Sequence, residues 1–363
     1  NKRNMISVII FILVLAIIIL VHELGHFIAA KKSGLVVEEF GFGFPPRIFS
    51  IKKGGTVYSL NLLPLGGFVK ILGEDGNQNE NINSFSSKSV GIRSLIIVSG
   101  VFMNFLLAIF LLIIGFNIGL PQIIDKNNEL TAKNIEIQII AVSNNSPAES
   151  AGIKMGDIVK YLTIDGKNII INEISTLQDT VENNKDKELI ITLERGQKKI
   201  EVGAIPRINP PEGEGPLGIA LAKTGIISYP WYESIWLGVK SAFSITWEIM
   251  QGFANLFKNL LFQGKVPQEL SGPVGIAVLT NQAANLGFIY LLQLVAIVSL
   301  NLTILNLLPF PALDGGRLLF LAIEKIKGSK INPKIENAFH SIGLVLIFTL
   351  LILLTYRDIL RLK

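Results

Sequence analysis

Two histidines and a glutamate occur in the segment L-V-H-E-L-G-H-F, directly after a long apolar run. His22 and His26 are four residues apart, which in a helix means about 400° of rotation and about 6 Å of rise. Both imidazoles therefore lie on one face and can hold the same metal ion. Glu23 stands beside them, close enough to act as a base on a water at the metal. The alternative is that these polar side chains are satisfied by neighbouring helices.

Two histidines do not complete a catalytic zinc site, which needs three protein ligands and an open position for water. The chain has no cysteine, so the third ligand must be an Asp, a Glu or His340. Asp314 is the better candidate, because Pro309 and Pro311 shortly before it break an apolar helix. Broken backbone at membrane depth is tolerated only where it is buried in protein or lines a wet cavity.

The composition predicts a polytopic α-helical membrane protein, because 50% of the residues are hydrophobic and only 17% are charged. Four stretches are long and apolar enough to be transmembrane helices, namely residues 6–30, 94–120, 286–308 and 338–356. The first could instead be a signal peptide, but its apolar run is too long for a typical one. The basic residues are scattered beside apolar runs, which argues against nucleic acid as a partner.

Lysines and arginines are concentrated in the loop after the first apolar stretch and in the loop after the third. The positive-inside rule places both loops in the cytoplasm. Both termini and the long segment between the second and third stretches are then extracytoplasmic, and H-E-L-G-H lies near the cytoplasmic side.

The segment between the second and third stretches predicts a small α+β domain over residues 121–208. Short β-rich runs alternate there with turn signals, and one helix fits residues 173–183. The stretch S-P-A-E-S-A-G-I-K-M-G-D-I-V-K-Y-L-T-I-D-G-K-N-I resembles a PDZ domain. Residues 209–282 predict a linker and an amphipathic helix, which lies on the membrane surface or packs on the domain. Residues 1–120 and 283–363 then form the two parts of the membrane domain.

Residues 56–71 predict a β-hairpin. Polar and apolar side chains alternate up to Leu62, and Pro64, Gly66 and Gly67 mark a turn into a second strand. We expect Asn61 to lie on its open edge. An ordinary cytoplasmic hairpin is the alternative to one that enters the membrane.

H-E-L-G-H in the first stretch, G-V-F-M-N (100–104) in the second and L-D-G (313–315) after the third match a known pattern. The chain resembles the site-2 protease family of intramembrane zinc metalloproteases, and the order of its parts is similar to the bacterial regulator-of-sigma-E protease branch. S-G-P-V-G (271–275) and P-L-G-G-F-V-K (64–70) are also similar to that branch. Enterobacterial members have two tandem PDZ domains, whereas this chain has room for one, which puts in doubt any substrate gating that needs both.

The resemblance implies roles for individual residues. His22, His26 and Asp314 would bind Zn²⁺, and Glu23 would accept a proton from water and pass it to the leaving amine. The membrane-associated hairpin would pair with an unwound substrate by strand addition. The residues expected to contact substrate are Asn61, Leu62, Gly66, Gly67, Asn104 and Asn306. Interhelical hydrogen bonding is an equal alternative for Asn104, as is helix capping for Asn306.

The function expected from this resemblance is cleavage of transmembrane segments of single-pass membrane proteins, such as anti-sigma factors or remnant signal peptides. The protein would lie in the bacterial inner membrane, in contact with lipid, and its PDZ-like domain would bind a peptide or protein ligand. A non-proteolytic zinc-binding chaperone or regulator and a PDZ scaffold are the alternatives. The intact Glu23 argues against the first, because a purely structural zinc site needs no base.

Overall fold

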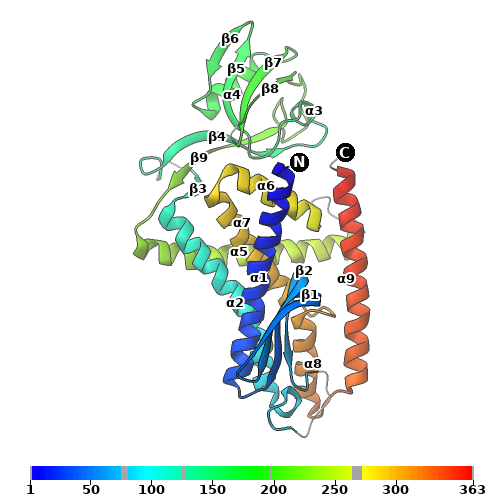
Figure 1. The fold of residues 1–363 in the computed structure, drawn as a ribbon. Helices are drawn as coiled ribbons and strands as arrows, with labels where there is room; N and C mark the ends of the chain where they lie inside the picture. The colour runs from blue at the N-terminus through cyan, green and yellow to red at the C-terminus, as the bar shows by residue number, and fades with distance from the viewer. Residues whose placement is uncertain (1, 75–80, 125–127, 197, 264–271, 362–363) are drawn as a thin grey trace. The chain divides into compact units, whose positions relative to one another are not determined.

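The computed structural model describes residues 2–74, 81–124, 128–196, 198–263 and 272–361 (Figure 1). The chain divides into two compact units. The membrane unit comprises Asn1–Ile114, Ile235–Ala284 and Leu292–Lys363, and the β-rich unit comprises Gly115–Ser234 with Asn285–Leu291.

The membrane unit contains long apolar helices. Helices α1 (Lys2–Lys32), α2 (Val90–Ile118), α7 (Phe288–Leu307) and α9 (Pro333–Arg361) are each long and apolar enough to cross a membrane, which confirms the prediction of four such helices. The shorter elements are a 3₁₀ turn, η1 (Phe85–Ser87), and helices α6 (Pro273–Leu286) and α8 (Asp314–Lys327).

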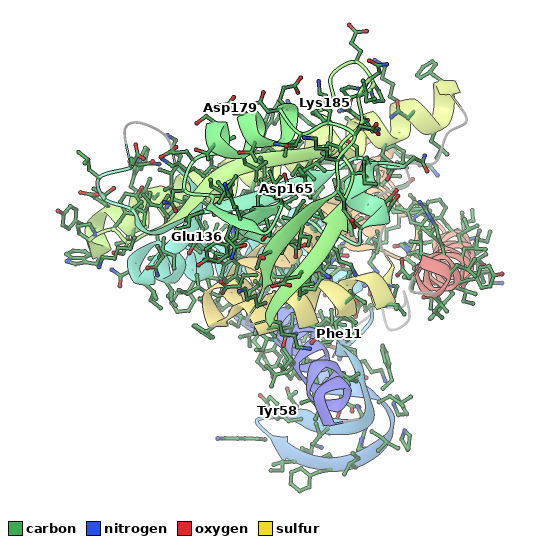
Figure 2. The ribbon with its side chains drawn as sticks, turned by 90° about the horizontal axis from the view of Figure 1, so that it is seen from above. Phe11, Tyr58, Glu136, Asp165, Asp179 and Lys185 are labelled. Carbon is green, nitrogen blue, oxygen red and sulfur yellow. The ribbon has the colours of Figure 1, made fainter. Side chains whose placement is uncertain are left out.

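A small two-strand sheet lies beside α1. Strands β1 (Val37–Lys53) and β2 (Thr56–Ile71) are antiparallel, and the sheet curves around one end of the helix (Figure 2). Both strands bend, and the first part of β1 lies between the two halves of β2. On one side, residues 37–42 of β1 pair with residues 67–71 of β2. On the other side, residues 39–44 of β1 pair with residues 57–63 of β2. Residues 47–53 pair with the outer side of residues 56–61.

This pairing differs from the predicted hairpin. The two halves of residues 56–71 do not pair with each other, because residues 37–44 lie between them. Asn61 belongs to an inner segment, is only 5% exposed, and its Nδ2 donates to the Gly43 carbonyl at 3.0 Å. The prediction that Asn61 lies on an open edge is therefore wrong. Sequence alternation indicates a strand but does not identify its partner, and here the partner precedes it.

Helix α9 contacts the rest of the membrane unit near both of its ends. His340 Nδ1 accepts a hydrogen bond from the Ala312 N–H at 3.0 Å, just before α8. At the other end, Asp358 accepts the N–H groups of Gly272 and Gly275 at 2.9 and 2.7 Å, and so caps the start of α6. Ser271, the first residue of the S-G-P-V-G motif, lies outside the described residues.

Helix α5 (Trp231–Gln263) is the amphipathic helix that the sequence predicts. Gly238 lies against α2, where an added Cβ would be 2.5 Å from a side-chain carbon of Ile113. The rings of Phe243 and Phe105 of α2 are 5.1 Å apart. Trp236 and Trp247, seven residues before and four residues after Phe243, lie on the same side of the helix as Phe243 and are exposed. Helix α5 therefore packs on a transmembrane helix of the membrane unit and still carries exposed aromatic side chains.

The β-rich unit is built on one sheet with strand order β3-β9-β4-β5-β7-β8, and β6 pairs with β5. Its strands are β3 (Leu120–Ile123), β4 (Lys133–Val142), β5 (Ile158–Ile164), β6 (Lys167–Ile170), β7 (Leu189–Arg195), β8 (Lys198–Ala204) and β9 (Ile219–Ile227). Helices α3 (Pro147–Ser150) and α4 (Ile174–Glu182) complete the unit. Leu177 and Val181 of α4 are one turn apart, and both are buried in the core.

The boundary predicted at residue 208 is too early. Strand β9 begins at Ile219, yet it lies in the sheet between β3 and β4. The Pro- and Gly-rich residues 209–218 therefore form a loop that returns the chain to the sheet, and are not a linker leaving the unit. Composition alone does not distinguish these two cases, because both need turn residues.

Candidate metal centre

Three potential metal ligands from two helices converge in the membrane unit. Nε2 of His22 lies 3.1 Å from Nε2 of His26 and 3.1 Å from Oδ2 of Asp314, and Nε2 of His26 lies 3.3 Å from the same oxygen. Together they form a group whose geometry could hold a metal ion. The structure thus brings together the three residues that the sequence predicts as ligands.

The donor set fits zinc. In tetrahedral coordination with bonds of about 2.0–2.1 Å, neighbouring ligand atoms are about 3.3 Å apart, close to the separations found here. His22, His26 and Asp314 would supply two imidazoles and one carboxylate, the kind of three-ligand set that keeps a position open for water or substrate in catalytic zinc sites. Oδ2 of Asp314 is buried and has no hydrogen-bond partner among the described residues, as expected of an atom that binds a cation.

The imidazole of His26 is oriented from its other side. Its Nδ1 donates to the Ile96 carbonyl of α2 at 2.9 Å, which directs the Nε2 lone pair towards the centre. Helix α2 comes close enough for this contact because residue 100 is glycine. A Cβ at Gly100 would be 2.4 Å from Nε2 of His26 and 2.9 Å from Cε1 of His22.

Asp314 is held at the first turn of α8 by a sharp break in the chain. Ala312 has a φ of 69°, a left-handed conformation that is uncommon for a residue other than glycine. Gly315 and Gly316 follow Asp314 and let α8 fold back on the chain before it. An added Cβ at Gly315 would be 2.1 Å from the Leu308 carbonyl oxygen, and one at Gly316 would be 2.4 Å from the Phe310 carbonyl oxygen. These contacts explain why the aspartate is followed by two glycines.

His340 is not among the converging ligands. Its Nδ1 accepts from the Ala312 backbone, so it supports the break that carries Asp314. Glu23 follows His22 in α1 and lies against the sheet, since an added Cβ at Gly67 would be 3.2 Å from Glu23 Cγ. Gly67, one of the predicted substrate contacts, therefore lies beside Glu23.

The remaining predicted substrate contacts are more scattered. Leu62 is 55% exposed, and Gly66 packs against the ring of Phe44. Asn104 is buried, and its carbonyl oxygen accepts the Ser299 hydroxyl of α7 at 2.9 Å. Its side-chain oxygen is buried without a partner among the described residues. Asn306 lies partly buried in the last turn of α7.

Two ion pairs near the centre were not predicted from the sequence. Arg317, one turn after Asp314 in α8, pairs with Glu74, whose carboxylate raises the pKa of the guanidinium. Arg93 of α2 makes a bidentate pair with Glu324 of α8 at 2.5 and 3.0 Å. Charged residues near the ends of apolar stretches are usually membrane flanks. No local signal in the sequence therefore identifies Glu74 as the partner of Arg317 or Glu324 as the partner of Arg93.

Comparison with known proteins supports the same chemistry. The profile of peptidase family M50 matches residues 10–350. The chain belongs to peptidase family M50. The regulator of sigma-W protease RasP of Bacillus subtilis is 30% identical to it, over 98% of this chain and 99% of the relative. The zinc metalloproteases RasP of Oceanobacillus iheyensis and Bacillus licheniformis are 31% and 32% identical, over 99% and 98% of this chain and 100% and 99% of the relatives.

This M50 peptidase is therefore an intramembrane zinc metalloendopeptidase of the site-2 type. The resemblance to the site-2 proteases and the expectation of Zn²⁺ as cofactor are confirmed. The family and the four apolar helices make it an integral membrane protein.

The third ligand can be tested by metal analysis of the purified M50 peptidase. We expect Asp314→Asn to lower zinc occupancy by about tenfold or more, because an amide oxygen is a far weaker zinc ligand than a carboxylate. His340→Ala should retain nearly full occupancy, because its imidazole contacts the backbone and lies outside the donor group. The reverse pattern would transfer the ligand role to His340.

Proposed function

We propose that this M50 peptidase cleaves transmembrane segments of single-pass membrane proteins, with His22, His26 and Asp314 holding zinc and Glu23 acting as the base. The observation that carries the proposal is the convergence of three ligand atoms within 3.1–3.3 Å of one another in the membrane unit. Charged and polar groups are costly inside a bilayer and are usually functional there.

Zinc, when bound, lowers the pKa of water and polarises a carbonyl. The residues of the chain supply the rest of the chemistry. Glu23 accepts the proton of the attacking water and later donates it to the leaving amine. The Ile96 carbonyl fixes the ring of His26, and the break before α8 fixes Asp314. Anti-sigma factors and remnant signal peptides are the substrates that we favour.

The role of Glu23 leads to a direct prediction. Glu23→Gln should keep zinc and the fold but reduce cleavage by about 10³-fold or more, because an amide cannot accept the proton. The measurement is cleavage of a panel of co-expressed single-pass membrane proteins, alongside zinc content. Cleavage at a near wild-type rate by the variant would remove Glu23 from the mechanism.

A substrate helix must be unwound before its carbonyls can reach the metal, and the sheet offers a surface for this. Residues 67–71 form an edge of the β1–β2 sheet among the described residues, and Gly67 lies against Glu23. We infer that an extended substrate segment adds to this edge by main-chain hydrogen bonds. The sheet exposes many apolar side chains, which suits insertion into the membrane: Phe44, Ile48, Phe49, Ile51, Leu60, Leu62 and Leu63.

Strand addition predicts a specific effect of proline at Val69. The Leu72 N–H donates to the Val36 carbonyl, and N–H groups alternate along a strand, so the Val69 N–H points to the open edge. Val69→Pro removes this donor and should reduce cleavage about tenfold, whereas Val69→Ala should stay near wild type.

Ile48→Pro, on the opposite edge of the sheet, is the matched control and should keep most of the activity. Zinc content and expression level identify misfolded variants. Equal cleavage by Val69→Pro and wild type, with zinc retained, would exclude strand addition at this edge.

The orientation that we propose follows the positive-inside rule. The loops after the first and third apolar helices are basic and cytoplasmic, while both termini and the β-rich unit are extracytoplasmic. The protein would then lie in the bacterial inner membrane with its metal centre nearer the cytoplasmic side.

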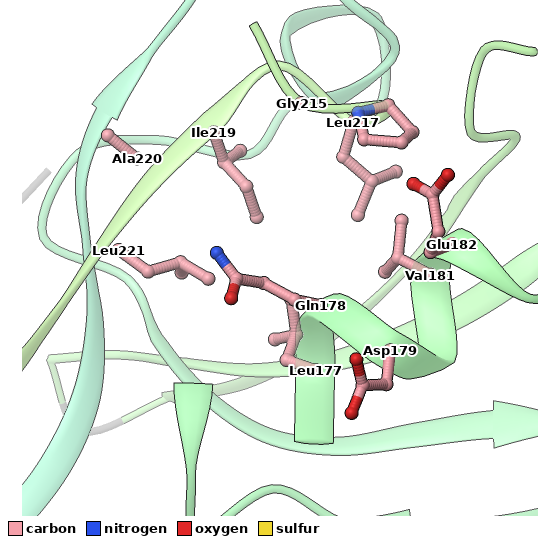
Figure 3. A pocket seen from close by; sticks show the side chains of 11 residues that line it. Leu177, Gln178, Asp179, Val181, Glu182, Gly215, Leu217, Ile219, Ala220 and Leu221 are labelled. Atoms are coloured by element: carbon pink, nitrogen blue, oxygen red, sulfur yellow. The ribbon is translucent and has the colours of Figure 1, made fainter. Parts of the chain in front are cut away.

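The β-rich unit carries a groove suited to an extended peptide, in keeping with its resemblance to a PDZ domain. The groove, of about 380 Å³, lies between α4 and the start of β9 (Figure 3). The Lys223 carbonyl of β9 accepts the Ile124 N–H on the side of β9 away from β4. Main-chain groups alternate along a strand, so the N–H and C=O groups of Ile219 and Leu221 point to the same side. We propose that a peptide ligand pairs there and seats apolar side chains against Leu177 and Val181.

Filling the groove should abolish this binding. Gln178 is exposed on α4 and extends towards Leu221 (Figure 3), so Gln178→Trp should weaken binding of peptides with an apolar C-terminus at least about tenfold. Ile190→Trp, on an exposed position of β7, is the control. Fluorescence anisotropy with the full-length protein measures both, and equal affinity for the two variants would exclude this groove.

A further inference from the structure

Among the residues that the structure describes, segment 67–71 is an edge of the β1–β2 sheet, and three of its backbone N–H groups point outward. The Leu72 N–H points to β1, where it donates to the Val36 carbonyl at 3.0 Å. Successive N–H groups of a strand point to opposite sides. Those of Ile71, Val69 and Gly67 therefore point away from β1, to the side on which a substrate strand would add.

One of the three donors is already taken. The Ile71 N–H donates to Oε2 of Glu74 at 3.4 Å, and the Glu74 N–H donates to the Ile71 carbonyl at 3.2 Å. Glu74 thus binds both main-chain groups of Ile71, as the next strand of a sheet would do. An added strand can pair with Gly67 and Val69 but not with Ile71.

Glu74 is held in this position by a residue of α8. Its other carboxylate oxygen, Oε1, pairs with the guanidinium of Arg317. Arg317 lies one turn after Asp314 on α8. The residue that ends the open edge is therefore fixed to the helix that carries the third metal ligand.

We propose that Glu74, held by Arg317, is a register stop that selects which peptide bond of the substrate is cleaved. The inference rests on the proposed strand addition at residues 67–71. Side chains alternate with a period of two, so a paired strand that slips by two residues keeps the same face and remains a competing register. By occupying Ile71, Glu74 excludes the register that would use this position and favours the register that pairs with Gly67 and Val69 alone.

The test maps the cleaved bond. The probe is a single-pass membrane protein that the wild type cleaves on co-expression, and mass spectrometry of both fragments locates the cut. Glu74→Ala removes the acceptor of the Ile71 N–H and leaves the backbone bond to the Ile71 carbonyl, so the freed donor should move about half of the cleavage to a bond two residues away. Glu74→Gln keeps one acceptor oxygen, which can bind the Ile71 N–H, and should therefore still cut mainly the wild-type bond. A role in stability alone would reduce the amount of product without moving the cut, and that result would overturn the proposal.

A second measurement does not depend on activity. The chain has no cysteine, so Val69→Cys in a Glu23→Gln background can be cross-linked to single cysteines placed along the probe. We expect one position of maximum cross-linking, and a second one two residues away when Glu74→Ala is added. An unchanged pattern would overturn the register stop, whereas no cross-linking in either background would overturn strand addition itself. Glu74→Asp, whose shorter side chain cannot reach Ile71, replaces Glu74→Ala if that variant does not accumulate.

Discussion

The membrane unit depends on keeping one carboxylate and two imidazoles in contact inside an apolar environment. Separations of 3.1–3.3 Å between the three ligand atoms are too short to be stable without a bound cation or shared protons. The surrounding structure therefore has to resist the tendency of these groups to separate. Three features restrict the ligands. Gly100 lets α2 pack against both imidazoles, and the Ile96 carbonyl fixes the ring of His26. The left-handed Ala312 before α8 fixes Asp314.

These restrictions combine local and long-range effects. Gly100 brings α2 against both imidazoles, and the break at Ala312 directs Asp314 towards them. The His340–Ala312 hydrogen bond then links this break to α9, whose far end caps α6 through Asp358. A displacement of α9 would therefore act on the metal centre through the backbone of the break.

Much of this arrangement could be predicted from the sequence. The i, i+4 spacing of the histidines and the prolines before Asp314 are local patterns, and they are enough to predict the three metal ligands. The four apolar helices follow from length and composition. The sheet pairing could not be predicted, because alternation at Asn61 indicates a strand but not its neighbours. Likewise, the position of β9 and the Glu74–Arg317 pair depend on contacts between residues far apart in the chain, for which one sequence carries no signal.

The order of the chain separates the ligands in an informative way. His22 and His26 lie before the β-rich unit and Asp314 lies after it, so the membrane unit is discontinuous in sequence. An inserted domain whose two ends leave from neighbouring helices can gain or lose length without displacing the residues on either side. The reaction chemistry and the inserted β-rich module of such a protein can therefore diverge at different rates during evolution.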